Sequence, residues 1–150
     1  FPQWFGDKAA EATKLYKKIY RDNNENLALL PGSLRLLLSA KQAGIKLAVI
    51  SNKISENLKT EISQLGLINY FECIIGSNDT NLNKPEIEPM MLALKLMNLE
   101  SRSVCYYGDT VTDMIFANNA GCIAIAFGAD LAGNNKYFLN HEDFIEFLKL

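Results

Sequence analysis

The chain has 150 residues, of which 49% are hydrophobic and 21% are charged, and its formal net charge at pH 7 is −2. This length suits one domain of ordinary size, and a slightly acidic chain without a basic block does not favour nucleic acid as a partner. No apolar run approaches the roughly 18 residues needed to cross a bilayer, so we expect no membrane span.

Hydrophobic periodicity predicts alternating helices and strands along most of the chain. Gly44 and Gly66 each follow an amphipathic stretch, in the position typical of a residue that ends a helix. The expected helices are 7–21, 34–43, 55–65, 88–99, 114–120 and 143–150, and the expected strands are 45–50, 71–75, 103–107 and 122–127. Strands separated by single helices form βαβ units, so the predicted fold class is α/β: a Rossmann-like parallel sheet with helices on both faces.

The three cysteines and the single histidine show no catalytic or zinc-binding spacing. Cys73, Cys105 and Cys122 lie in strand-like apolar runs without a C-x-x-C pair. We expect them to be reduced and buried, in a cytoplasmic protein. His141 precedes the last expected helix, and we expect no catalytic role for it.

Polar side chains follow three successive expected strands, at the edge where sheets of this kind bind ligands. Ser51 and Asn52 follow the first strand, and a hydroxyl with backbone N–H groups ahead of a helix can hold phosphate oxygens. The loop after the second strand carries Lys84, a point charge suited to a phosphate or a developing anion. After the third strand, Asp109 and Asp113 lie one helical turn apart, and such oxygen ligands suit Mg²⁺.

Each of these features also has a structural explanation. Ser51 or Asn52 could cap the following helix, and Lys84 could be an exposed loop residue. The two aspartates could act as turn former and helix N-cap. The occurrence of all three features in this order favours a functional site over three unrelated structural ones.

The motifs resemble those of the haloacid dehalogenase-like hydrolase superfamily, from about residue 29 to residue 150. Residues 49–53 resemble the second motif of that family, and Lys84 with Pro85 resembles the third. Residues 108–113, Gly-Asp-Thr-Val-Thr-Asp, resemble the fourth and most specific motif.

The resemblance extends more loosely to phosphoglycolate phosphatases, through residues 51–53 and the 76–79 loop. Relatives often carry Lys-Pro-x-Pro-x-Pro, whereas this chain has Ile87 in place of the middle proline and keeps Pro89.

The resemblance implies a Mg²⁺-dependent phosphatase that acts on a small phosphorylated metabolite by way of a phosphoaspartate. Ser51 and the Asn52 N–H would bind the phosphoryl group, and Lys84 would neutralise charge on the nucleophile and the phosphate. Asp109 would ligate Mg²⁺, and Asp113 would ligate it or orient its waters. Phosphoglycolate is the leading candidate substrate.

The resemblance also implies two regions. Residues 1–27 would be the end of a small helical cap, and residues 28–150 would be the α/β core without its first strand. We expect the cap aromatics to pack within the cap rather than line it; they are Trp4, Phe5, Tyr16 and Tyr20.

The sequence departs from the family at its first motif, because it contains no Asp-x-Asp to supply the nucleophile. In the family, the strand that carries this motif lies between the strands that end at Ser51 and Asp109. We therefore expect a gap in the sheet, with unpaired backbone groups on both sides.

Three explanations of this departure are open. The sequence could be a portion of a longer protein, which its start at Phe1 rather than Met favours. It could be a split gene product that pairs with a complementing N-terminal chain. It could also be a catalytically inactive domain that binds a phosphorylated ligand or a protein partner.

Overall fold

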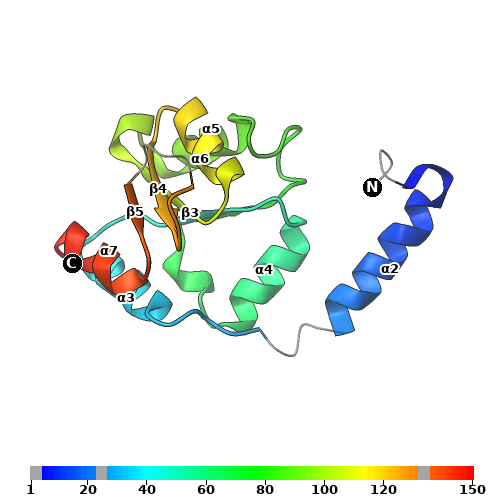
Figure 1. The fold of residues 1–150 in the computed structure, drawn as a ribbon, viewed down its shortest axis with the longest axis horizontal. Helices are drawn as coiled ribbons and strands as arrows, with labels where there is room; N and C mark the ends of the chain where they lie inside the picture. Colours follow the sequence, from blue (N-terminus) through cyan, green and yellow to red (C-terminus); the bar gives the residue numbers. More distant parts are fainter. Residues whose placement is uncertain (1–4, 23–26, 132–135) are drawn as a thin grey trace.

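The computed structural model describes residues 5–22, 27–131 and 136–150 (Figure 1). The described helices and short 3₁₀ turns are η1 (Gly6–Lys8), α2 (Ala9–Asp22), α3 (Ser33–Gln42), α4 (Ser55–Gln64), η3 (Ile68–Tyr70), α5 (Glu88–Met97), η4 (Ser101–Ser103), α6 (Val111–Asn119) and α7 (His141–Leu148). The described strands are β1 (Ala48–Ile50), β2 (Cys73–Ile75), β3 (Cys105–Gly108), β4 (Ile123–Phe127) and β5 (Lys136–Phe138).

The strands form two parallel sheets. One consists of β1 and β2, in the register Ala48 to Cys73. In the other, β4 lies between β3 and β5. Among the strands that the structure describes, β1 and β3 share no hydrogen-bonded ladder, so the sheet is interrupted where the sequence predicts a gap, between the strands that precede Ser51 and Asp109.

Helices cover both faces of the strands, as the sequence predicts. Successive side chains of a strand point to opposite faces, and the two tyrosines of β3 show which helix lies on each. The ring of Tyr106 meets Phe116 of α6 at 5.0 Å, and that of Tyr107 meets Phe144 of α7 at 4.3 Å. Figure 1 accordingly shows α5 and α6 on one side of the strands and α3 and α7 on the other.

The main core lies between the strands and the α5 and α6 helices. Its fully buried side chains include Ile75, Met90, Met114 and Phe116. A smaller cluster, centred on Leu58, Ile62 and Leu67, packs α4 against the sheet of β1 and β2.

Several helix boundaries follow from local signals. Gly44 and Gly66 come directly after the C-caps of α3 and α4, with positive φ angles of 73° and 72° that glycine adopts without strain. The α7 helix begins at His141, earlier than predicted, because the Asn140 side chain caps it by accepting a hydrogen bond from the Asp143 N–H.

The sequence analysis missed one strand, and one of its expectations was wrong. β5 was not predicted, because a three-residue strand with two exposed side chains has too little apolar pattern to stand out. Cys105 is exposed and Cys73 only half-buried, so Cys122 alone is buried as expected; all three thiols are free. Cys105 is the first residue of β3, which is an edge strand among the described residues, so one side of it has no neighbouring strand there.

The α2 helix lies apart from the rest of the described chain in Figure 1. Phe5 and Tyr16, which we expected to pack within a cap, are 49% and 44% exposed. Trp4 and the side chain of Tyr20 lie outside what the structure describes. None of the described helices combines the length and apolar character needed to cross a bilayer.

Candidate active site

The predicted site residues lie at the carboxyl ends of β1 and β3 and in the loop that follows β2. Asn52 connects two of these segments. Its side-chain Oδ1 accepts a hydrogen bond from the Lys84 N–H, and its Nδ2 donates one to the Lys84 carbonyl, each at 3.0 Å. The amide thus pairs with the Lys84 backbone as a neighbouring strand would, and holds the loop against the end of β1.

The Lys84 side chain extends from this loop toward β3 and α6. Its Nζ lies 2.6 Å from Asp113 Oδ1 and 3.0 Å from the Tyr106 hydroxyl. Only 12% of the Lys84 side chain and 5% of the Asp113 side chain is exposed. An ion pair this well enclosed is far less screened by solvent and salt than one on the surface.

Asp113 stays ionised in this position. Burial raises the pKa of the Asp113 carboxyl, but hydrogen bonds from Lys84 and Thr110, together with the Lys84 charge, outweigh that effect and hold the pKa below its usual range. The site therefore contains a fixed negative charge beside a fixed positive one.

Thr110 orients Asp113 through a capping box at the start of α6. The Asp113 Oδ2 accepts hydrogen bonds from the Thr110 N–H at 3.1 Å and the Thr110 hydroxyl at 2.6 Å. The Thr110 Oγ1 accepts in turn from the Asp113 N–H at 3.2 Å. Two otherwise unpaired N–H groups are satisfied in this way, and the carboxylate has little freedom to rotate.

Gly108 makes the close approach of Asp113 possible. A Cβ atom at this position would lie 2.5 Å from the Asp113 Cβ and 2.7 Å from its Cγ. The glycine is therefore required by the packing of the α6 helix against the end of β3, and any larger residue would move Asp113.

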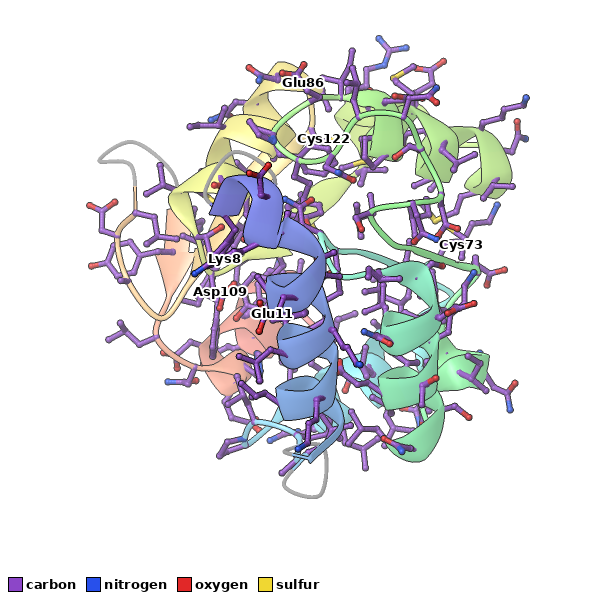
Figure 2. The ribbon with its side chains drawn as sticks, turned by 90° about the vertical axis from the view of Figure 1, so that its right-hand side faces the viewer. Lys8, Glu11, Cys73, Glu86, Asp109 and Cys122 are labelled. Carbon is purple, nitrogen blue, oxygen red and sulfur yellow. The ribbon has the colours of Figure 1, made fainter. Side chains whose placement is uncertain are left out.

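Asp109 differs from Asp113, because it is exposed and follows directly after the last residue of β3. Figure 2 shows α2, with Glu11, in front of the α/β body that carries Asp109. The Asp109 carboxylate is open to a ligand, whereas both oxygens of Asp113 already accept hydrogen bonds.

These carboxylates fit a cation that is shared with a substrate. No group of three or more potential metal ligands lies together in the described part of the chain, so the chain offers no all-protein metal cage there. Mg²⁺ usually binds through one or two carboxylates, substrate phosphate and water. Asp109, whose carboxylate is open, matches that requirement, whereas Asp113 could contribute only through a water, because its own oxygens already accept hydrogen bonds.

The structure brings Asn52, Lys84 and Asp113 into direct contact. Ser51 lies at the same edge, and its Oγ accepts a hydrogen bond from the Lys53 N–H at 3.2 Å, which is a local turn contact. The sequence reasoning missed Thr110 and Tyr106. A threonine three residues before an acid is a helix-start signal that could have been used, whereas the contact of Tyr106 with Lys84 depends on the tertiary fold.

His141 lies on the other face of β3, away from Lys84. It is buried, with its Nε2 3.0 Å from Ser33 Oγ and its Nδ1 3.3 Å from the Tyr107 hydroxyl. Its ring stacks on Phe127 with centroids 4.5 Å apart. These contacts join α3, β3, β4 and α7.

The fold and the order of these residues agree with comparisons to known proteins. Residues 3–127 match the family described as haloacid dehalogenase-like hydrolase. The chain belongs to this family.

Individual relatives support the same assignment. A phosphoglycolate phosphatase from Neisseria meningitidis is 35% identical over 130 residues, which are 85% of this chain and 54% of the relative. A protein from Caldanaerobacter subterraneus, provisionally named a pyrophosphatase, is 32% identical over 114 residues, which are 73% of this chain and 52% of the relative. The chain spans about half the length of the curated relatives it matches.

A solved structure extends the likeness to nearly the whole chain. The crystal structure of a hydrolase of the same superfamily from Ehrlichia chaffeensis has a TM-score of 0.79 and 34% sequence identity. The match covers 99% of this chain and 72% of that one.

Proposed function

We propose that this chain is the greater part of a Mg²⁺-dependent phosphatase that hydrolyses a small phosphomonoester, with phosphoglycolate as the leading candidate. The observation that carries the proposal is the enclosed Lys84–Asp113 pair, at 2.6 Å, beside the exposed Asp109. A fixed cation next to an open carboxylate suits a phosphate that shares a metal with the protein. The free cysteines fit the reducing cytoplasm, where we propose the protein resides.

Each residue has a role in this proposal. Ser51 and the Asn52 N–H bind the transferring phosphoryl group, and the Lys84 ammonium neutralises charge on that group and on the nucleophile. Asp109 ligates the metal. Asp113 holds Lys84 and reaches the metal through a water, because its own oxygens already accept hydrogen bonds. Mg²⁺, when bound, would offset the negative charge of the phosphoryl oxygens.

The nucleophile would come from a strand inserted between β1 and β3. In a parallel strand, alternate residues direct their backbone groups to alternate neighbours. The Leu47 carbonyl and the Ser51 N–H bond toward β2, so the backbone groups of Ala48 and Ile50 face away from it.

The edge of β3 that faces β1 also presents backbone groups that point away from its own sheet. The Val104 carbonyl accepts a hydrogen bond from Ile123 on the β4 side. By the same alternation, the backbone groups of Cys105 and Tyr107 face the other way, toward β1. Two parallel edges with outward-facing donors and acceptors suit one additional parallel strand, either from a longer form of this protein or from a complementing chain.

Two substitutions in the native gene product test the proposal. Asp109→Asn removes a negatively charged ligand, and Lys84→Ala removes the cation, so each should abolish Mg²⁺-dependent turnover of a phosphomonoester. Wild-type activity in the Asp109→Asn variant would show that the metal assignment is wrong.

A second candidate is a binding domain without turnover, which the absence of Asp-x-Asp from the sequence favours. It predicts that Mg²⁺ and a phosphate mimic raise the thermal unfolding temperature of a chain that hydrolyses nothing. Binding without turnover, in a gene product whose measured mass equals that of this chain, would support this candidate over the phosphatase.

A further inference from the structure

The Tyr106 hydroxyl touches three of the groups that surround the candidate site. It lies 3.0 Å from Lys84 Nζ, 3.1 Å from the Ile50 carbonyl and 3.3 Å from Asp113 Oδ1. These partners belong to the loop after β2, to β1 and to α6, while Tyr106 belongs to β3. One phenol thus joins all the segments that carry the predicted site residues.

The hydroxyl remains neutral in this environment. Burial raises the pKa of Tyr106 strongly, and the adjacent Asp113 raises it further. A neutral phenol has one proton to donate and lone pairs to accept. It can therefore accept a hydrogen bond from Lys84 and donate its own proton to the Ile50 carbonyl. Where an inserted strand occupies that carbonyl, Asp113 Oδ1 is the alternative acceptor, at 3.3 Å.

The Lys84 ammonium has three protons in tetrahedral directions. One is donated to Asp113 and a second to Tyr106. Once two of the three directions are fixed, the third is fixed as well. With Asp113 alone, the Cε–Nζ end of the side chain could swing about that single hydrogen bond, and the free proton would change direction with it. The hydrogen bond to Tyr106 is a second anchor that prevents this movement.

We propose that Tyr106 is a positioning residue for Lys84, which aims the free ammonium proton at the phosphoryl group by holding the ammonium against Asp113. This inference rests on the proposed function, because it assigns Lys84 the phosphoryl group as its target. Tyr106 touches no reacting atom in this account and acts only through Lys84.

Packing also supports a fixed position for the phenol. The Tyr106 ring meets the fully buried Phe116 ring edge-to-face, with centroids 5.0 Å apart and an interplanar angle of 81°. Tyr106→Phe keeps this aromatic contact and removes only the hydroxyl, so the substitution isolates the hydrogen bonds.

The next residue provides a matched control. Tyr107 has its side chain on the opposite face of β3, and its hydroxyl lies 3.3 Å from His141 Nδ1. Tyr107→Phe removes the same atom, one residue along the same strand, without touching Lys84. A general effect of losing a phenol from β3 would appear in both variants.

The first test compares both variants in the native gene product, with Mg²⁺ and p-nitrophenyl phosphate. Tyr106→Phe should lower kcat about tenfold or more, as expected for losing a hydrogen bond to a charged group, and should change KM less. Tyr107→Phe should keep the wild-type kcat. Equal kcat values in the two variants would overturn the proposal.

The second test does not depend on turnover, so it also separates this proposal from the proposed function. The ¹H–¹⁵N signal of the Lys84 ammonium, assigned through Lys84→Arg, reports whether its protons are held. We expect a signal in the wild type and in Tyr107→Phe, and its loss in Tyr106→Phe. A signal that persists in Tyr106→Phe would overturn the positioning role, whether or not the wild type is active. An inactive wild type would by itself refute only the proposed phosphatase activity.

Discussion

The Asn52 side chain forms two hydrogen bonds with the backbone of Lys84, each 3.0 Å long. One amide therefore fixes where the Lys84 loop meets the end of β1. The sequence places these residues 32 positions apart, and the fold brings them together at the edge where the candidate site lies.

Asn52→Ala should separate this loop from β1. We expect kcat/KM of the native gene product to fall about tenfold or more, because two hydrogen bonds that position Lys84 are lost. Steady-state kinetics would measure the effect.

Asn119→Ala is the matched control for this substitution. The Asn119 Nδ2 lies 3.4 Å from the Pro85 carbonyl, so it holds the same loop through one long hydrogen bond. We expect kcat/KM close to the wild-type value. An equal loss in the two variants would show that Asn52 has no special role in positioning Lys84.

Thr110→Ala should destabilise the protein by removing the cap of α6. The loss of an N-cap side chain typically costs about 1 kcal/mol, and up to about 2 kcal/mol, of unfolding free energy. Urea denaturation followed by circular dichroism would measure this loss.

Thr110→Ser keeps the hydroxyl that bonds to Asp113, so its unfolding free energy should stay within about 0.5 kcal/mol of the wild type. If Thr110→Ser were destabilised as much as Thr110→Ala, the capping hydrogen bonds would not be the cause.

Much of the fold could be predicted from local patterns. The glycines after α3 and α4 and the periodic apolar residues of the helices and strands are signals within a few residues, and they predicted the α/β class and most helices. β5 escaped prediction because its three residues, Lys136–Phe138, gain their strand conformation from pairing with β4.

The candidate site was predictable in its residue types and not in its contacts. The sequence indicates that Asn52, Lys84 and Asp113 lie at one sheet edge. It does not indicate that the Asn52 amide binds the Lys84 backbone, or that Tyr106 contacts Lys84, because such contacts depend on side-chain directions across elements 22 to 32 residues apart.

Stability should depend on pH through His141. Burial lowers the pKa of His141, and the adjacent Glu142 only partly opposes this effect. The pKa of His141 in the unfolded chain is about 6.5, so below that pH the unfolded chain binds more protons than the folded one. The contribution of neutral His141 to the free energy of unfolding is therefore fully present above that pH. It should decline as the pH falls below about 6.5 and through the lower pKa that His141 has in the folded protein.

His141→Phe should flatten this part of the pH dependence relative to the wild type, since phenylalanine can still stack on Phe127. Urea denaturation between pH 5 and 8 would compare the slopes, and carboxylates common to both proteins would cancel in the difference. Identical slopes would show that His141 is not the titrating group.

Backbone hydrogen exchange should reveal the two facing sheet edges. In residues 1–150 alone, the Ile50 and Tyr107 amides should exchange quickly, because they face the gap between β1 and β3. The Val49 and Tyr106 amides, which face β2 and β4, should be protected. Equal protection of all four amides in this chain would contradict the proposed insertion of a strand.

The most direct test of the account is hydrolysis of phosphoglycolate by the native gene product, with Mg²⁺ and after its removal by a chelator. The account predicts turnover with Mg²⁺, loss of activity on chelation, and recovery when Mg²⁺ is restored. Turnover that persists without any divalent cation would contradict it, as would a complete absence of phosphomonoester hydrolysis in a gene product that contains the missing strand.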